Sequence, residues 1–312
     1  MQRYEGRPLA RPDEELVDQG LGFDLGTVLN RRRLLSAFGL GAAAVSLAAC
    51  DPASDTPSAS AASSGTAEGE IPDETAGPYP GDGSNGPDVL DDSGIVRADI
   101  RSSFGGATGT AEGVPMTLEL TIVDMAGNKP FAGTAVYVWH CDREGRYSLY
   151  SDGVTDQNYL RGVQIADEQG KVRFTSIFPA CYTGRWPHVH FEVYRDQAAI
   201  TDATNAIATS QVALPKDVCD TVYAQSGYAQ SVRNLAQVTL QSDNVFGDDG
   251  GTLQLGTVTG SVSSGYTVAL TARVDTRTTP TGGGAPGGGG GPGGGPGGGP
   301  GGMPPSGAPG GA

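Results

Sequence analysis

The sequence has few of the side chains that most often bind metals or act as nucleophiles. Its 312 residues include three His and four Cys. Any metal or nucleophile hypothesis must therefore use a very short list of residues.

Positive charge is also scarce. Lys and Arg total 20 against 35 Asp and Glu, so the formal net charge is −15. The first 49 residues hold six Arg and six acidic residues, so the whole excess of negative charge lies in the remainder of the chain. Because such a balance repels phosphate backbones, we expect no nucleic-acid partner.

Long hydrophobic runs are missing as well. The uncharged run Leu34–Ala49 has 16 residues, fewer than the roughly 20 that a membrane-spanning helix needs. It follows the arginines Arg31–Arg33, which resemble a twin-arginine export signal, and ends before Cys50 as a bacterial lipobox does. Residues 1–49 are thus predicted to be a cleaved leader and Cys50 the lipidated residue of an exported, extracytoplasmic protein anchored to the cell membrane. The alternative is an interfacial helix with an incidental cysteine.

Composition divides the rest of the chain into three parts. Residues 50–70 are rich in Ser and Ala and are predicted to be a flexible tether. Residues 277–312 form a Gly/Pro-rich tail, predicted to be disordered, with 19 Gly and 7 Pro in its last 32 positions. Residues 71–276 remain as one folded domain.

Within that domain the hydrophobic pattern has a period of two. Met116–Ile122, Val189–Val193 and Tyr266–Val274 alternate apolar and polar residues, and Thr134–His140 is apolar on both faces like a central strand. Asp217–Gln225 is the best short helix. These patterns predict an all-β protein, an antiparallel β-sandwich with long loops and little helix.

His188 and His190 are the strongest chemical signal. Two residues apart on a strand, they project from the same face and can converge on one ion. Without further context, two histidines with this spacing are more often partly exposed residues of a strand than metal ligands. A carboxylate partner would have to come from elsewhere, because Glu192 lies about 13 Å from His188 by strand rise. A zinc site would have to recruit His140, which reads as a core residue.

The surrounding motifs resemble those of the intradiol ring-cleavage dioxygenases, which include the protocatechuate and catechol dioxygenases. The segments that carry the resemblance are Glu74–Tyr79 (ETAGPY), Trp139–Tyr147 (WHCDREGRY), Tyr159–Gly162 (YLRG), Ala166–Pro179 (ADEQGKVRFTSIFP), Tyr182 and Arg185–His190 (RWPHVH). Ala166 stands where the family usually has Thr, and beyond Tyr194 the match fades.

The resemblance implies a chemistry. Its metal ligands are Tyr159, Tyr182, His188 and His190, and its cofactor is a non-haem Fe(III) ion, which two phenolates and two imidazoles suit. Tyr159 doubles as the catalytic base, Arg185 stabilises charge beside the substrate, and Tyr79 lines the substrate mouth or packs. The implied reaction cleaves a catechol-type ring with O₂ to a muconate-type diacid. A noncatalytic, lipid-anchored binding module that retains the motif is the alternative.

Three cysteines remain after Cys50. An odd number in an oxidising compartment suggests one disulfide and one thiol. The predicted bridge is Cys141–Cys181, with Cys181–Cys219 as its rival.

Overall fold

A computed structural model describes residues 3–4, 7–8 and 69–281. Most of the predicted leader, Cys50, most of the tether and residues 282–312 lie outside the described residues. No described helix is long and apolar enough to cross a membrane.

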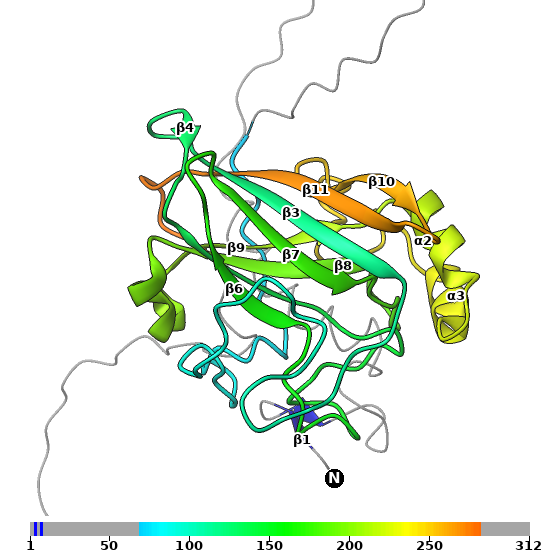
Figure 1. Cartoon of the computed structure of the whole chain (residues 1–312). Coiled ribbons are helices and arrows are strands. Elements are labelled where there is room, and N and C mark those ends of the chain that lie inside the picture. The colour runs from blue at the N-terminus through cyan, green and yellow to red at the C-terminus, as the bar shows by residue number, and fades with distance from the viewer. Residues whose placement is uncertain (1–2, 5–6, 9–68, 282–312) are drawn as a thin grey trace, which may run out of the picture.

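The described chain is built around two packed sheets joined by long loops (Figure 1). The first has the order β10-β11-β3-β4, with β7 also paired to β3, and the second has the order β6-β5-β8-β9. A separate short pair joins β1 and β2. The strands are β1 (Arg3–Tyr4), β2 (Arg7–Pro8), β3 (Pro115–Asp124), β4 (Lys129–Pro130), β5 (Ala135–Trp139), β6 (Arg161–Ile165), β7 (Lys171–Ile177), β8 (His188–Tyr194), β9 (Ala206–Ala213), β10 (Thr257–Ser261) and β11 (Gly265–Val274).

Helices are few and short. They are η2 (Gln197–Thr201), η3 (Ala203–Asn205), α2 (Lys216–Tyr223) and α3 (Ala229–Leu235). The predicted short helix is confirmed as α2, and α3 was not anticipated. Figure 1 shows α2 and α3 together at one end of the sandwich.

The all-β sandwich is confirmed, with one correction to its strand directions. β11 runs parallel to β3, with Tyr266 opposite Met116 and Val274 opposite Asp124. A tight hairpin would enforce an antiparallel pair, but the chain crosses the whole second sheet between β3 and β11, so no turn restricts the direction of β11. The other named strand pairs are antiparallel.

The main core fills the space between the sheets. Alternate residues of β3 point into it, and β5, β8 and β11 contribute Val138, Phe191 and Val268. This burial explains the period of two seen in the sequence.

The second sheet is buried on its other face too. Tyr137, Trp139 and Tyr194 lie there under a long segment that includes Ala76 and Leu90. Every residue of β5 and β8 is therefore buried, which is why the sequence of β5 is apolar on both faces. This covered outer face also carries His188 and His190.

Neither predicted disulfide forms. The thiols of Cys141, Cys181 and Cys219 are all free and buried. The Cys141 thiol lies 3.7 Å from the carbonyl oxygen of Ala180, and the Cys181 thiol lies 3.4 Å from that of Arg185. The thiols thus point toward main-chain acceptors, and burial raises their pKa values.

Candidate metal centre

The two histidines of β8 meet as their spacing predicted. Their Nε2 atoms lie 3.0 Å apart, and both side chains are buried. His188 donates from Nδ1 to the carbonyl oxygen of Trp186 at 2.5 Å, which leaves its Nε2 lone pair free to accept. His190 stacks on Trp139 with ring centroids 4.8 Å apart.

Tyr182 joins this pair. Its hydroxyl oxygen lies 3.2 Å from His188 Nε2. It comes from the loop between β7 and β8, where the main chain of its neighbour Cys181 is held by Ser231 and Asn234 of α3. The loop position of the tyrosine is thus fixed by a helix that is distant in sequence.

The fourth donor atom, a second phenol oxygen, comes from Tyr147. Its hydroxyl lies 3.5 Å from that of Tyr182, and its ring packs edge-on against His190 with centroids 6.2 Å apart. The sequence contained a signal for this residue, since Tyr147 ends the segment Trp139–Tyr147 that resembles the dioxygenases. The resemblance of the motifs implies Tyr159, and not Tyr147, as the second tyrosine ligand of the metal.

Tyr159 has a different hydrogen-bond partner. Its buried side chain donates to Asp142 Oδ2 at 3.1 Å. Asp142 also accepts from the main chain and side chain of Arg146, at 2.9 Å in both cases. Asp142 thereby closes the loop that ends at Tyr147, and Tyr159 donates to the same carboxylate oxygen as the Arg146 side chain.

Burial sets the protonation of these groups. It lowers the pKa of His188 to about 3, with Arg185 acting in the same direction, and burial and His188 together lower that of His190. Both imidazoles are therefore neutral at physiological pH and able to act as ligands. Burial raises the pKa values of Tyr147 and Tyr182, so their phenolate forms need a nearby cation.

The arrangement fits a metal ion. Neighbouring ligands on one ion lie about 3 Å apart, which is the spacing of these donor atoms. His190 Nδ1 is buried without a hydrogen-bond partner. Among the described residues, no group of three or more His, Cys, Asp and Glu is arranged to hold an ion, so a metal at this centre requires the phenol oxygens.

His140 does not belong to the centre. Its Nδ1 donates to the carbonyl oxygen of Cys141, and its Nε2 pairs with the Ser176 hydroxyl, both at 2.7 Å. The expectation of a core histidine is confirmed. With both ring nitrogens engaged in this way, His140 offers no ligand for the alternative zinc site.

Arg185 and Tyr79 flank the centre. Arg185 is buried and donates to Asp243 at 3.0 Å and to Gln211 at 2.6 Å. Burial acts to lower its pKa, but Asp243 outweighs this and raises it. The Tyr79 ring packs 5.1 Å from that of Tyr147. No sequence signal indicated Asp243 or Gln211, which follow Arg185 by 58 and 26 residues.

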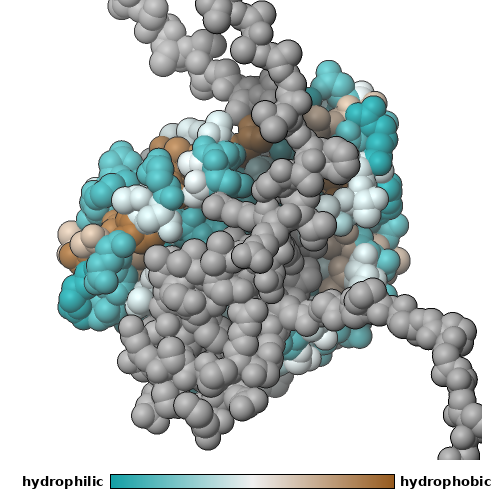
Figure 2. Space-filling view, turned by 180° about the vertical axis from the view of Figure 1, so that it is seen from behind, coloured by the Kyte–Doolittle hydropathy of each residue, from teal (hydrophilic) through white to brown (hydrophobic). Residues whose placement is uncertain are grey.

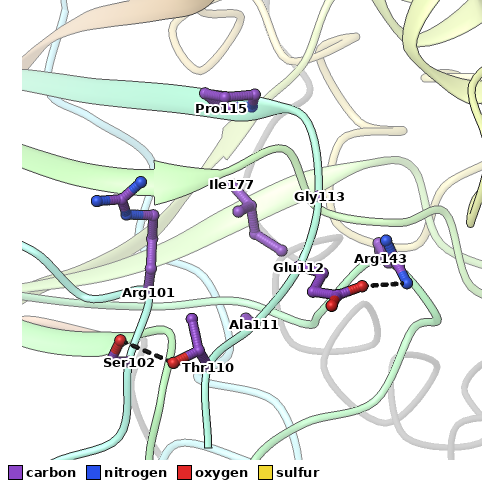
Figure 3. A pocket seen from close by; sticks show the side chains of 9 residues that line it. All are labelled: Arg101, Ser102, Thr110, Ala111, Glu112, Gly113, Pro115, Arg143 and Ile177. Atoms are coloured by element: carbon purple, nitrogen blue, oxygen red, sulfur yellow. Dashed lines mark hydrogen bonds and ion pairs between the residues drawn. The ribbon is translucent and has the colours of Figure 1, made fainter.

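One cavity in the described part of the molecule lies elsewhere. It has a volume of about 500 Å³ and is lined by Arg101, Ser102, Thr110, Ala111, Glu112, Gly113, Pro115, Arg143 and Ile177 (Figure 3). Its two arginines are already paired, Arg143 with Glu112 and Arg101 with Asp99, each at 2.7 Å. It contains none of the four donor residues.

Comparison with known proteins agrees with the site. Residues 86–203 match the family model described as Dioxygenase, and that segment contains all four donors. The matched segment is similar to the intradiol dioxygenases. The chain is 39% identical over 71 residues to catechol 1,2-dioxygenase of Pseudomonas sp. (strain EST1001), a match that covers 23% of each chain. It is 37% identical over 62 residues to chlorocatechol 1,2-dioxygenase of Rhodococcus opacus, covering 20% of this chain and 24% of the other. These matches span about a quarter of the length of the curated relatives.

A solved structure shares the fold. It is an intradiol ring-cleavage dioxygenase from Tetranychus urticae, with a TM-score of 0.53 and 24% identity over 66% of this chain and 95% of that one. At this identity the likeness concerns the architecture of the dioxygenase domain alone.

Proposed function

We propose that the protein is a non-haem Fe(III) intradiol dioxygenase that cleaves a catechol-type ring between its two hydroxyl-bearing carbons. One catechol and one O₂ combine to give one muconate-type diacid, so all atoms of both reactants appear in the product. The observation that carries the proposal is the convergence of two imidazole nitrogens and two phenol oxygens in one buried centre. The match to the dioxygenase family model and the similarity to catechol 1,2-dioxygenase support it.

Tyr147, Tyr182, His188 and His190 would hold the ion, with Tyr147 in the role first assigned to Tyr159. A ferric ion bound there supplies a Lewis acid that favours loss of the catechol protons and draws electron density from the ring. Two anionic phenolates with two neutral imidazoles form a hard donor set that favours Fe(III).

The chain's own residues perform the remaining steps. The Tyr147 oxygen, next to Tyr182, serves as the base that accepts a proton from a substrate hydroxyl. Arg185 is oriented by Asp243 and Gln211, and its Nη1 takes no part in those bonds, so it is the nitrogen offered to negative charge on the ring. The segment that includes Tyr79 covers the outer face of the second sheet and excludes water from the centre.

The test combines a metal measurement with a reaction. Purified protein should contain about one iron per chain, absorb broadly in the visible through phenolate-to-iron charge transfer, and consume O₂ with catechol to yield a diacid identified by mass spectrometry. Colourless protein that contains zinc would overturn the ligand assignment. Coloured, iron-loaded protein that consumes no O₂ with any catechol would favour the noncatalytic module.

We further propose that the protein is exported and held at the cell membrane by a lipid on Cys50. The support is the sequence alone, in which arginines, a short uncharged run and a cysteine follow one another in the order of a bacterial lipoprotein signal. The domain would then meet its substrate outside the cytoplasm.

A further inference from the structure

The charge of Arg185 is compensated inside the site. Its side chain is 8% exposed and that of Asp243 is fully buried, with Arg185 Nε 3.0 Å from Asp243 Oδ2. Asp243 also accepts from the main-chain N–H groups of Trp186, Val245 and Phe246, at 2.6, 2.8 and 3.1 Å. The carboxylate is thus held firmly beside the guanidinium, and burial acts to raise its pKa but Arg185 lowers it.

A second cation, Arg161, acts on His190, and main-chain oxygens accept its hydrogen bonds. Arg161 is buried and donates to the carbonyl oxygens of Tyr79, Pro80 and Ser148 at 2.7–3.0 Å. Arg161 thereby links the segment around Tyr79 and Pro80 to the second sheet, and its guanidinium N–H groups are already engaged in hydrogen bonds within the protein.

Two acidic segments border the metal centre. The first passes over His190, since a Cβ added to Gly77 would lie 3.4 Å from His190 Cε1. Three residues earlier in this segment stands Glu74. The neighbouring Thr75 is tied to the site because its carbonyl oxygen accepts from Gln211, the residue that also binds Arg185.

The second acidic segment passes beside His188. Phe246 lies edge-on to the His188 ring with centroids 6.4 Å apart, and Asp248 and Asp249 follow it. Gln211 links Thr75 of the first segment to Arg185, and Arg185 is paired with Asp243 of the second, so the two segments come together around the same space. Glu74 also interacts electrostatically with Asp248, Arg185, Asp243 and Asp249. Burial, followed by the charge of Asp248, raises the pKa of Glu74 to about 8.

One cation therefore faces four carboxyl groups at this border. With Glu74 protonated at neutral pH, the remaining three still outnumber Arg185. A carboxylate on the substrate would meet like charge there. Asp243 is buried and Glu74 half-buried, which strengthens repulsion relative to water, whereas Asp248 and Asp249 are exposed and act more weakly. An uncharged substituent avoids this cost, and an ammonium group would gain from it.

This inference rests on the proposed function. We propose that the site selects catechols whose ring substituent is uncharged or cationic and rejects those that carry a carboxylate, with Asp243, Glu74, Asp248 and Asp249 as the specificity-determining residues.

The experiment uses three catechols that differ in the charge of one substituent: 4-methylcatechol, 4-(2-aminoethyl)catechol and 3,4-dihydroxybenzoate. Binding to the iron-loaded protein is measured by calorimetry without O₂, and kcat/KM by O₂ uptake. We expect 3,4-dihydroxybenzoate to have a Kd and a kcat/KM at least about tenfold worse than 4-methylcatechol, a difference of roughly 1.4 kcal/mol. Equal or better binding of the carboxylate would overturn the proposal.

Variants identify the residues responsible. The double variant Asp248→Asn, Asp249→Asn should reduce the discrimination severalfold at neutral pH. Glu74→Gln should reduce it only above about pH 8, where Glu74 is charged. Iron content and colour should be unchanged in both variants. Glu168→Gln removes an exposed carboxylate from the turn before β7 and should leave it unchanged. Asp243 is left unchanged in this test, because it anchors a loop through three main-chain N–H groups and its replacement would disturb the fold as well as the charge. Discrimination that persists in both acidic-segment variants would contradict the assignment.

The calorimetric arm separates this proposal from the proposed function. Protein that binds catechols with the expected charge preference but consumes no O₂ would refute the dioxygenase activity and support charge selection. Protein that cleaves all three catechols equally would do the reverse.

Discussion

The hydroxyl of Tyr159 donates to Asp142 Oδ2 at 3.1 Å. The same carboxylate accepts from the main chain of Arg146 and so closes the loop that leads to Tyr147. Two buried tyrosines near the metal centre therefore have different structural roles. Tyr147 contacts Tyr182 and His190, whereas Tyr159 supports the loop that positions Tyr147.

Exchange of each tyrosine for phenylalanine distinguishes these roles. Tyr147→Phe and Tyr182→Phe should each change the visible absorption of the iron-loaded protein, because each removes a phenolate donor. Tyr159→Phe should keep the absorption band and lower the free energy of unfolding by about 1–2 kcal/mol, since it removes one hydrogen bond to a buried carboxylate. Visible spectra and urea unfolding measure both effects. A band lost in Tyr159→Phe and kept in Tyr147→Phe would restore Tyr159 as the ligand.

Loss of either histidine of β8 should remove the metal. His188→Ala and His190→Ala each delete a neutral donor from one side of the centre, so iron per chain, measured by elemental analysis, should fall well below half of the wild-type value. His140→Gln is the matched control, because His140 is buried but bonded to Ser176 and a main-chain carbonyl. Full iron retention in both alanine variants would contradict the proposed centre.

The same control residue makes the fold sensitive to acid. Burial lowers the pKa of His140 to about 4, below the ordinary value of 6.5, so between these values the unfolded chain binds a proton that the folded chain does not. Stability contributed by neutral His140 is thus lost as pH falls from 6.5 toward 4, by up to about 1.4 kcal/mol per pH unit. Urea midpoints at several pH values should show a steeper acid loss in wild type than in His140→Gln. Parallel curves would show that His140 does not titrate in this way.

Membrane attachment should depend on the thiol of Cys50, the residue that follows the predicted leader. Cys50→Ser removes the thiol that would carry the lipid, so the protein should move from the membrane fraction to the soluble fraction with unchanged catechol turnover. Fractionation followed by immunoblotting measures this, with Cys219→Ser as a control that leaves the predicted lipid site intact. A Cys50→Ser protein that stays with the membrane would refute the lipoprotein hypothesis.

The described surface of the domain is mainly hydrophilic. In the view of Figure 2, hydrophilic residues dominate the described surface and hydrophobic ones are scattered between them. The exposed large hydrophobic residues are Val96, Val232 and Leu255. The candidate metal centre lies instead beneath the segment that covers the second sheet.

Local periodicity determined much of this protein from its sequence. An alternation of two in β3, β8 and β11 predicted strands, and the spacing of His188 and His190 placed both rings on one face, because successive side chains of a strand point to opposite sides. The fold class and the histidine pair are consequences of neighbours along the chain.

Tertiary structure decided the contacts between distant segments. The way in which the loop after β5 folds back over the sheet brings Tyr147 next to Tyr182. Asp142 holds this loop through hydrogen bonds with Arg146 and Tyr159, and residue spacing alone does not predict those bonds. The parallel pairing of β11 with β3, and the pairing of Arg185 with Asp243, likewise join residues tens of positions or more apart. Strand periodicity restricts only where a side chain points, whereas the partner that it meets is set by the packing of the whole chain.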